Sequence, residues 1–390
     1  MARNSDIAVL DIGSRKVSVL IGDKNEKGIY NIKGIGQFDY AGYACGKWYD
    51  EDSLKKAVSG ALKIAEVEAG VKVRKLYIGV PAEFLAVNVK EVTEVYPKTT
   101  RITDTETDRL FRQGGNFETD AFTEINCSPV YYTLDGSSKR IIEPRGATVQ
   151  KLSGLLSYIL CENTFINLFD SIAEELKLKE VEYVATPWAE ALGLISAEQR
   201  DKYAIIIDIG YISSSVAVIR GDGLLHLSSF SIGGGHIAGD IFQALDLPFQ
   251  VCCEIQNKID LNLVYSVEEY HEVNDNGTVY RAAAEDVNYV TRERLEEIAG
   301  YIRQALDICK FDCPVYAPVY LTGGGITFIR GAKEYISASI NRKLEILAPS
   351  LPRYNTPAFA SLMGLFEVAV LLNGKSGTNF IKKLIAKIGG

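Results

Sequence analysis

The sequence predicts an α/β protein built from two similar halves. Residues 7–20 and 204–220 each consist of two apolar strand-like runs joined by a polar turn, and each turn contains Asp-Ile-Gly. Asp11 and Asp208 end the first run in each case. Strand and helix patterns alternate around both hairpins, as is typical of α/β layers. We therefore expect two related lobes whose hairpins face one another.

Both turns have the composition of a phosphate-binding clamp. Turn backbone N–H groups and hydroxyls can surround phosphate oxygens, and the carboxylates of Asp11 and Asp208 can hold a hydrated Mg²⁺ between them. A pair of ordinary hairpins with polar turns is the alternative. The repeated Asp-Ile-Gly order and a later glycine run favour the clamp.

That glycine run, Gly323-Gly324-Gly325, follows the predicted strand Val319–Leu321 and is expected to open another helix. Glycines there can permit close contact between a strand and a helix, or let a nucleotide lie on bare backbone. In third place after two Asp-Ile-Gly hairpins, the run favours the nucleotide.

Composition narrows the class of protein. With 390 residues, 47% of them hydrophobic and 24% charged, the chain fits a well-packed protein of two or more domains. The formal net charge of −8 argues against a general nucleic-acid binder. Residues 1–6 are polar, so no signal peptide is expected, and no apolar run is long enough to span a bilayer. The seven cysteines are scattered and odd in number, which indicates reduced thiols and no zinc site.

Other segments organise the chain around these motifs. An amphipathic helix is predicted from Asp50 to Gly70, and a long one from Thr291. From Phe84 to Leu160 the pattern changes to long alternating strands with a short helix, which indicates an inserted subdomain.

The ordered set of motifs resembles the FtsA family of bacterial cell-division proteins, within the actin-like ATPase superfamily. Both Asp-Ile-Gly hairpins, the Thr322–Gly325 run, and the segment Ile232–Ile237 with Asp240-Ile241 carry the resemblance. It covers essentially the whole chain. It implies a two-lobed actin-like (ribonuclease H-like) α/β fold with an inserted α+β subdomain, called 1C.

The resemblance also implies a function. Members hold ATP and Mg²⁺ in the cleft, form head-to-tail polymers through 1C, and bind the C-terminal tail of the tubulin-like protein FtsZ and other division proteins. They act as peripheral proteins on the cytoplasmic face of the cell membrane, at the septum. Matching the family's nucleotide motifs position by position implies these nucleotide-binding residues: Asp11, Gly13, Ser14, Lys16, Asp208, Gly210, Ser213, Ser214, Gly323, Gly324 and Gly325.

Two positions depart from the family. Tyr211 and Ile212 follow Gly210, where the family has bare glycines, so side chains stand where backbone approaches phosphate. The stretch Gly300–Ile302 replaces a Glu-Ala-Arg that lies near the ribose in the family. We therefore expect an ATP-binding protein with weak or no ATPase activity.

The resemblance divides the chain as follows: 1–83 and 163–203 form subdomain 1A, 84–162 the 1C-like insert, 204–239 and 301–372 subdomain 2A, 240–300 subdomain 2B, 373–378 a linker, and 379–390 a membrane-targeting helix.

The residue pattern of 379–390 independently predicts an amphipathic, membrane-binding helix. On a helix, Phe380, Ile381, Leu384, Ile385 and Ile388 share one face, Lys382 and Lys383 lie opposite, and Lys387 borders the apolar face. Such a short helix is marginal in water and is stabilised at an anionic membrane surface. The alternative is a terminal helix packed on its own domain.

Two other functions remain open. One is that of PilM, a cytoplasmic actin-like scaffold of pilus assembly, which usually lacks a terminal amphipathic helix. The other is an actin-fold small-molecule kinase, for which Glu190 is a weak candidate as the catalytic carboxylate, with Asp208 beside it.

Overall fold

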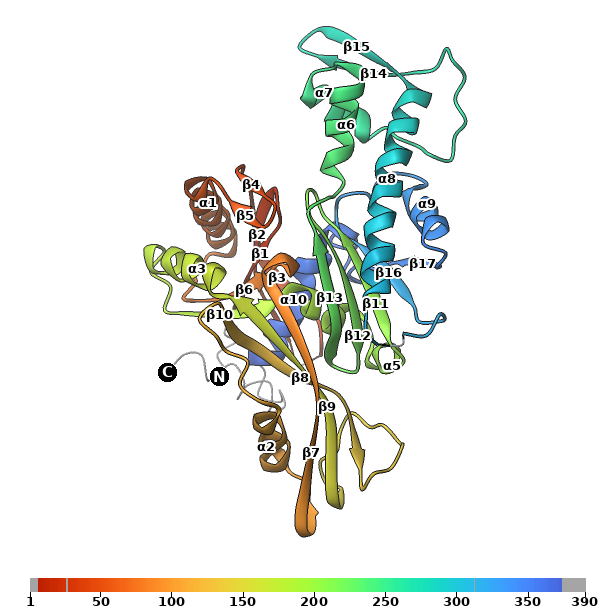
Figure 1. The fold of residues 1–390 in the computed structure, drawn as a ribbon. Coiled ribbons are helices and arrows are strands. Elements are labelled where there is room, and N and C mark those ends of the chain that lie inside the picture. Colours follow the sequence, from red (N-terminus) through yellow and green to blue (C-terminus); the bar gives the residue numbers. More distant parts are fainter. Residues whose placement is uncertain (1–5, 26, 312, 374–390) are drawn as a thin grey trace.

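The computed structural model describes residues 6–25, 27–311 and 313–373, and it shows two lobes that each carry a five-stranded sheet (Figure 1). The first sheet has the strand order β3 (Tyr30–Asp39), β2 (Lys16–Lys24), β1 (Ile7–Ile12), β6 (Lys75–Val80) and β10 (Glu180–Ala185). The second has the order β13 (Gly223–Phe230), β12 (Ser214–Arg220), β11 (Ala204–Ile209), β16 (Val319–Thr322) and β17 (Leu344–Ile346).

The two sheets repeat one topology. In the first, β1, β2 and β3 form an antiparallel meander, and β6 and β10 run parallel to β1. In the second, β11, β12 and β13 form the meander, and β16 and β17 run parallel to β11. The two similar halves that the sequence predicts are therefore present, and each Asp-Ile-Gly hairpin is the central turn of its sheet.

Helices pack on the first sheet and form the rest of the first lobe. Its long helices are α1 (Glu51–Ala69), α3 (Asn163–Glu175), α4 (Thr186–Leu194) and α10 (Ala360–Asn373). The expected division placed α10 in subdomain 2A of the second lobe, but its apolar residues pack on α4 and β1 of the first. The side chain of Asp50 caps α1, and Gly70 ends it in the left-handed conformation. Gly36 of β3 lets α1 approach closely, because a Cβ at this position would lie 1.8 Å from the carbonyl oxygen of Ala61. The short elements β4 (Tyr43–Ala44), β5 (Lys47–Trp48) and η1 (Ala82–Phe84) complete this lobe. The short helix α5 (Ala197–Asp201) packs against the second sheet, where Arg200 donates a hydrogen bond to the carbonyl of Gly221 at 3.0 Å.

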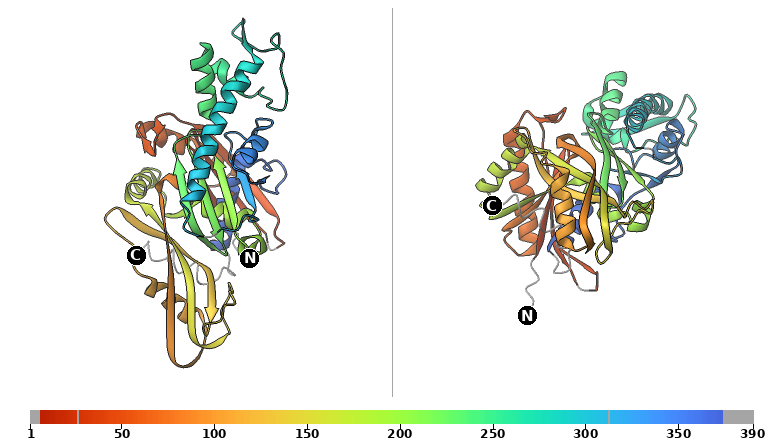
Figure 2. Two further views of the ribbon diagram at one scale, coloured as in Figure 1. Left: turned by 45° about the vertical axis from the view of Figure 1, so that its right-hand side comes forward. Right: turned by 60° about the horizontal axis from the view of Figure 1, so that its bottom comes forward.

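Between η1 and α3 the chain forms a separate three-stranded antiparallel sheet that extends away from the lobes (Figure 1). The sheet has the strand order β7 (Leu85–Arg101), β9 (Thr148–Glu162) and β8 (Phe122–Leu134), and the helix α2 (Asp104–Gly114) lies between β7 and β8 in the chain. We call this sheet together with α2 the insert. Figure 1 and the left view of Figure 2 show it at the end of the molecule opposite β14 and β15.

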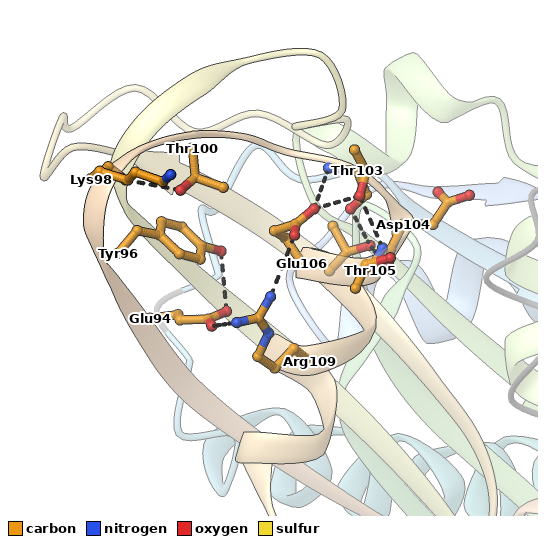
Figure 3. A network of polar contacts seen from close by, with 10 residues as sticks. Glu94, Tyr96, Lys98, Thr100, Thr103, Asp104, Thr105, Glu106 and Arg109 are labelled. Carbon is orange, nitrogen blue, oxygen red and sulfur yellow. Dashed lines mark hydrogen bonds and ion pairs between the residues drawn. The ribbon is translucent and has the colours of Figure 1, made fainter.

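A polar network fastens α2 to β7 within the insert (Figure 3). Arg109 of α2 forms ion pairs with Glu94 at 3.1 Å and with Glu106 at 3.4 Å. Tyr96 donates a hydrogen bond to the same Glu94 at 3.1 Å, and Glu106 closes a capping box with Thr103. Because Glu94 is buried, these partners offset the cost of enclosing its charge.

The second lobe has its own extension, made of α6 (Gly235–Leu245), α7 (Phe249–Gln256), β14 (Tyr270–Asp275), β15 (Thr278–Ala283) and the upper end of α8 (Ala284–Asp307). The remaining elements are α9 (Ala332–Ser339) and η2 (Pro357–Phe359). Two expected helix starts are wrong. The long helix begins at Ala284 rather than Thr291, because β15 leads straight into it. The helix expected directly after Gly325 begins only at Ala332.

Within these described ranges, no helix combines the length and the apolar character needed to cross a membrane. The predicted linker 373–378, after its first residue, and the predicted amphipathic helix 379–390 lie outside the described residues.

Candidate functional site

A cleft of about 460 Å³ lies between the two lobes, where the turns of both central hairpins meet. Ten of the eleven residues that the sequence assigns to nucleotide binding line it: Asp11, Gly13, Ser14, Lys16, Asp208, Gly210, Ser213, Ser214, Gly323 and Gly324. The structure therefore brings together residues that are far apart in the chain. The eleventh, Gly325, lies behind this lining, where its N–H donates to the carbonyl of Ile209 at 2.8 Å.

The two hairpins present the same geometry to the cleft. Asp11 stands opposite Ser18 in the first, and Asp208 stands opposite Ser215 in the second. Each turn is closed by the N–H of its glycine: Gly13 donates to the carbonyl of Lys16 at 3.0 Å, and Gly210 donates to that of Ser213 at 2.9 Å. Equivalent hairpins thus carry a carboxylate, a tight turn and a polar residue to one place. The two turns differ in charge, because the residue that accepts this closing hydrogen bond is Lys16 in the first turn and Ser213 in the second.

The carboxyl groups of Asp11 and Asp208 are hard to ionise in the folded protein. Burial raises the pKa of Asp11 to about 6, against the smaller opposing effect of Lys16. Burial, followed by the negative charges of Asp11 and Glu83, raises the pKa of Asp208 to about 7. A positive charge placed between these groups would relieve both effects.

The surroundings of Asp208 fit a hydrated cation. Its Oδ1 is buried and has no hydrogen-bond partner among the described residues, and neither does the hydroxyl of Thr186, which also lines the cleft. Gly323, with φ of +89°, leaves room beside it, because a Cβ there would lie 2.1 Å from Asp208 Oδ1. In the described part of the chain no three His, Cys, Asp or Glu residues are placed to ligate a metal together. A Mg²⁺ in this cleft would therefore be held largely through water and phosphate.

Glu190 lies behind the cleft lining rather than in it. It is 1% exposed and accepts a hydrogen bond from the hydroxyl of Ser361 at 3.0 Å, and it is Ser361 that lines the cleft. Burial, and after it the charge of Asp208, raises the pKa of Glu190 well above its ordinary value. The backbone of Gly364 packs directly on this residue. This position favours a structural role for Glu190 over that of a catalytic carboxylate.

A set of residues that the sequence did not reveal shapes the first turn. The hydroxyl of Tyr40 donates to the carbonyl of Gly13 at 2.7 Å, and the indole N–H of Trp48 donates to Tyr40 at 3.2 Å. Tyr43 donates to Glu83 at 2.5 Å, and Glu83 lines the cleft. Glu83 could have been identified from the sequence, because it follows the carboxyl end of the buried parallel strand β6, where ligands of α/β sheets bind. Nothing in the sequence around Tyr40 and Trp48 indicates that they support the first turn.

The two glycine runs of the second lobe pack on each other and on the second turn. A Cβ at Gly234 would lie 1.9 Å from the carbonyl oxygen of Gly325, and one at Gly325 would lie 2.1 Å from that of Gly210. The N–H groups of Gly234 and Gly235 donate to the carbonyls of Gly210 and Tyr211 at 2.9 and 2.6 Å. These glycines are required by backbone packing, and Gly323 and Gly324 also face the cleft.

Comparison with known proteins agrees with this geometry. The model of the family "Cell division protein FtsA" matches residues 205–364. The cell-division protein FtsA of Neisseria meningitidis is 23% identical over 379 residues, covering 94% of this chain and 91% of that protein. FtsA of Enterococcus faecalis is 25% identical, covering 96% of this chain and 85% of its relative. The predicted resemblance to the FtsA family is confirmed.

Solved structures confirm the actin-like fold expected for an FtsA relative. The PilM–PilN type IV pilus biogenesis complex superposes with a TM-score of 0.63 at 15% identity, covering 94% of this chain and 99% of that one. MreB 5 of Spiroplasma citri bound to AMPPNP superposes with a TM-score of 0.56 at 11% identity, covering 99% of both chains. The predicted two-lobed actin-like fold is therefore correct.

Proposed function

We propose that this chain is an FtsA-like actin homologue that binds ATP with Mg²⁺, polymerises on the inner face of the cytoplasmic membrane and tethers FtsZ filaments there during cell division. The observation that carries the nucleotide part is the meeting of both Asp-Ile-Gly turns at one cleft. The family relationship supports the division part. FtsZ, other division proteins and further copies of the chain are the proposed partners.

The residues of the cleft suit a nucleoside triphosphate. The turn at Gly13 offers backbone N–H groups and the hydroxyl of Ser14, and Lys16 adds a positive charge for phosphate. From the other lobe, Ser213 and Ser214 stand at the second turn, while Gly323 and Gly324 leave bare backbone for the adenosine side. A Mg²⁺, when bound, supplies charge that offsets both the phosphates and the carboxylates of Asp11 and Asp208.

The proposal assigns the remaining parts of the chain to assembly and attachment. The insert extends from the lobes and is proposed as the contact with the next subunit of a polymer (Figure 2). Residues 379–390 are proposed as the membrane anchor, at the septum, on the amphipathic pattern described above. Attachment by a short helix would make the protein peripheral and its binding reversible.

Co-sedimentation tests this function directly. The purified protein should pellet with anionic liposomes, recruit FtsZ to the pellet, and form filaments on the lipid when ATP and Mg²⁺ are present. FtsZ lacking its C-terminal tail is the matched control and should stay in the supernatant. Liposomes that bind the protein but recruit no FtsZ would refute the tethering function.

The alternative function is that of a PilM-like scaffold, which the superposition on the PilM–PilN complex favours. Such a scaffold would bind a short tail of a membrane protein and would not need lipid binding of its own. A small-molecule kinase is a more distant alternative, and the enclosure of Glu190, its candidate catalytic carboxylate, behind Ser361 argues against it. Absence of the purified protein from liposome pellets, with ATP binding retained, would favour the scaffold.

A further inference from the structure

The two phosphate-binding turns contact each other directly across the cleft. The backbone N–H of Ile212, in the second turn, donates a hydrogen bond to the hydroxyl oxygen of Ser14, in the first, at 3.1 Å. The side chain of Ile212 also packs against the larger hydrophobic cluster, which is formed mostly by the first lobe. Ile212 is thus attached to the opposite lobe by both its backbone and its side chain.

A second contact lies beside the first. The guanidinium carbon of Arg15 stands 4.9 Å from the centre of the Tyr211 ring, within the range of a cation–π interaction. The ring also lies close to Gly235, where a Cβ would approach Tyr211 Cε2 to 2.6 Å. Tyr211 therefore contacts both bare backbone of its own lobe and an arginine of the opposite lobe.

These contacts come from the two residues that depart from the family pattern. The backbone N–H of Ile212 and the side chains of Tyr211 and Ile212 join the two turns without any ligand. A ligand shifts a conformational equilibrium only by its difference in affinity for the two states. The γ-phosphate of ATP could favour the closed cleft by bridging the two turns. If the turns are already joined without ligand, that bridge adds little free energy to closing the cleft.

We propose that Tyr211 and Ile212, with Ser14 and Arg15, form a latch between the lobes that makes the nucleotide site insensitive to the γ-phosphate. The site then accepts ADP as readily as ATP, and its closed form exists without nucleotide. This inference rests on the proposed nucleotide binding, and it adds Tyr211 as the residue that determines the choice between di- and triphosphate.

The test compares ADP with a non-hydrolysable ATP analogue by calorimetry, in the full chain with Mg²⁺. Wild type should bind the two within about threefold of each other. In Tyr211→Ala the latch is weakened, so ADP binding should fall more than that of the analogue, giving a preference for the triphosphate of at least about fivefold. Tyr211→Phe keeps a ring under Arg15 and should retain the wild-type ratio.

Hydrogen exchange provides a readout that needs no ligand. In the nucleotide-free protein, the amide of Ile212 should exchange slowly because it is bonded to Ser14, and it should exchange faster in Tyr211→Ala while the distant helix α8 is unchanged. Fast exchange in wild type, or the same ADP-to-analogue ratio in Tyr211→Ala as in wild type, would overturn the latch. Binding of neither nucleotide to wild type would refute the proposed function, and the inference would fail with it.

Discussion

Asp208 lies near Asp11 across the cleft, and their carboxyl groups cannot both ionise easily. Burial first, and the negative charge of Asp11 second, raises the pKa of Asp208 to about 7. The Oδ1 atom of Asp208 is left without a hydrogen-bond donor among the described residues. A buried acceptor without a donor costs free energy, and a cation placed beside it would offset that cost. The pair of carboxyl groups therefore fits the positively charged ligand that we propose for this cleft.

Asp208→Asn should abolish Mg²⁺-dependent ATP binding. The amide has nearly the same shape but cannot supply the negative charge that a hydrated Mg²⁺ requires. Calorimetry with ATP and Mg²⁺ should show a loss of affinity of at least about tenfold. Asp246→Asn, the same substitution at the exposed C-terminal end of α6 and outside the cleft lining, is the matched control and should bind ATP like wild type. An unchanged ATP affinity in folded Asp208→Asn would rule out the assignment.

The same variant should be more stable than wild type at high pH in the absence of nucleotide. The folded pKa values of Asp11 and Asp208, about 6 and 7, exceed the ordinary aspartate value of 3.8, so the folded state holds more protons between about pH 4 and 7. Stability of the empty wild-type protein should therefore fall as pH rises through this window. For an isolated group, raising the pKa by one corresponds to about 1.4 kcal/mol.

Urea unfolding at pH 5 and pH 8 checks this prediction. The difference between Asp208→Asn and wild type should be larger at pH 8, where Asp208 must ionise, than at pH 5, where it is protonated in the fold. Added Mg²⁺ with ATP should reverse the order of stability at pH 8. Equal differences at both pH values would show that Asp208 ionises freely in the folded protein.

The sequence predicted those parts of the site whose structure is set by residues adjacent in the chain. The strand-turn-strand pattern placed Asp11 and Asp208 correctly, because a hairpin turn is set by a few adjacent residues. The role of Gly325 could not be read in the same way, since its constraint is the carbonyl of Gly210, far away in the sequence. The start of α8 at Ala284 was missed because strand and helix patterns join there without a cap.

The contacts between the two lobes could not be predicted from the sequence, because they join residues that are far apart in the chain. Tyr211 and Ile212 were recognised only as departures from a glycine pattern. Their partners, Arg15 and Ser14, lie in the other half of the sequence. Ser361, which lines the cleft in front of Glu190, belongs to a helix that nothing in its local sequence connects to a binding site.

ATP turnover should be slow or absent although ATP binds. Tyr211 lines the cleft at the second turn, where its side chain takes up room that a phosphate group and an attacking water would need. Steady-state phosphate release from purified protein should stay well below about 1 s⁻¹, the lower end of typical enzyme rates. Robust release that survives repeated purification and is lost in Asp208→Asn would contradict this expectation.

The insert should contribute to assembly through its exposed part and to stability through its base. Val95 of β7 is 70% exposed, whereas Val130 of β8 is fully buried against the second lobe. Val95→Glu should prevent filament formation on lipid without lowering the melting temperature, and Val95→Thr, which keeps the shape, should not. Filaments of normal length in Val95→Glu would remove this face of β7 from the contact.

Deletion of residues 84–160 is a poor test of the same idea. Ser157 donates a hydrogen bond to the carbonyl of Leu224 at 2.6 Å, and the N–H of Asp222 donates to Pro129 at 3.2 Å, so the insert is bonded to the second lobe as well as continuous with the first. Its removal would expose core from both. Val130→Ala alone should destabilise the protein by on the order of 2 kcal/mol, measured by urea unfolding.

The final prediction concerns residues 379–390, whose amphipathic pattern is a property of the sequence alone. If the segment forms a helix, five large apolar residues would share one face, and burial of each is worth roughly 1.5–3 kcal/mol when complete, and less at an interface. Helix ordering opposes binding, and the lysines add attraction only to anionic lipid. Attachment should therefore be reversible and weakened by salt.

Substitutions on the two faces separate the apolar from the electrostatic contribution to membrane binding. Leu384→Glu places a charge in the middle of the apolar face and should release the protein from liposomes at any salt concentration, while Leu384→Met should not. Lys382→Glu with Lys383→Glu should instead remove the preference for anionic lipid. ATP binding should survive all three changes, because the segment lies beyond the last described helix. If Leu384→Glu still co-sediments with anionic liposomes like wild type, the anchor is elsewhere, and a terminal segment packed on its own domain, as in a pilus-type scaffold, becomes the better account.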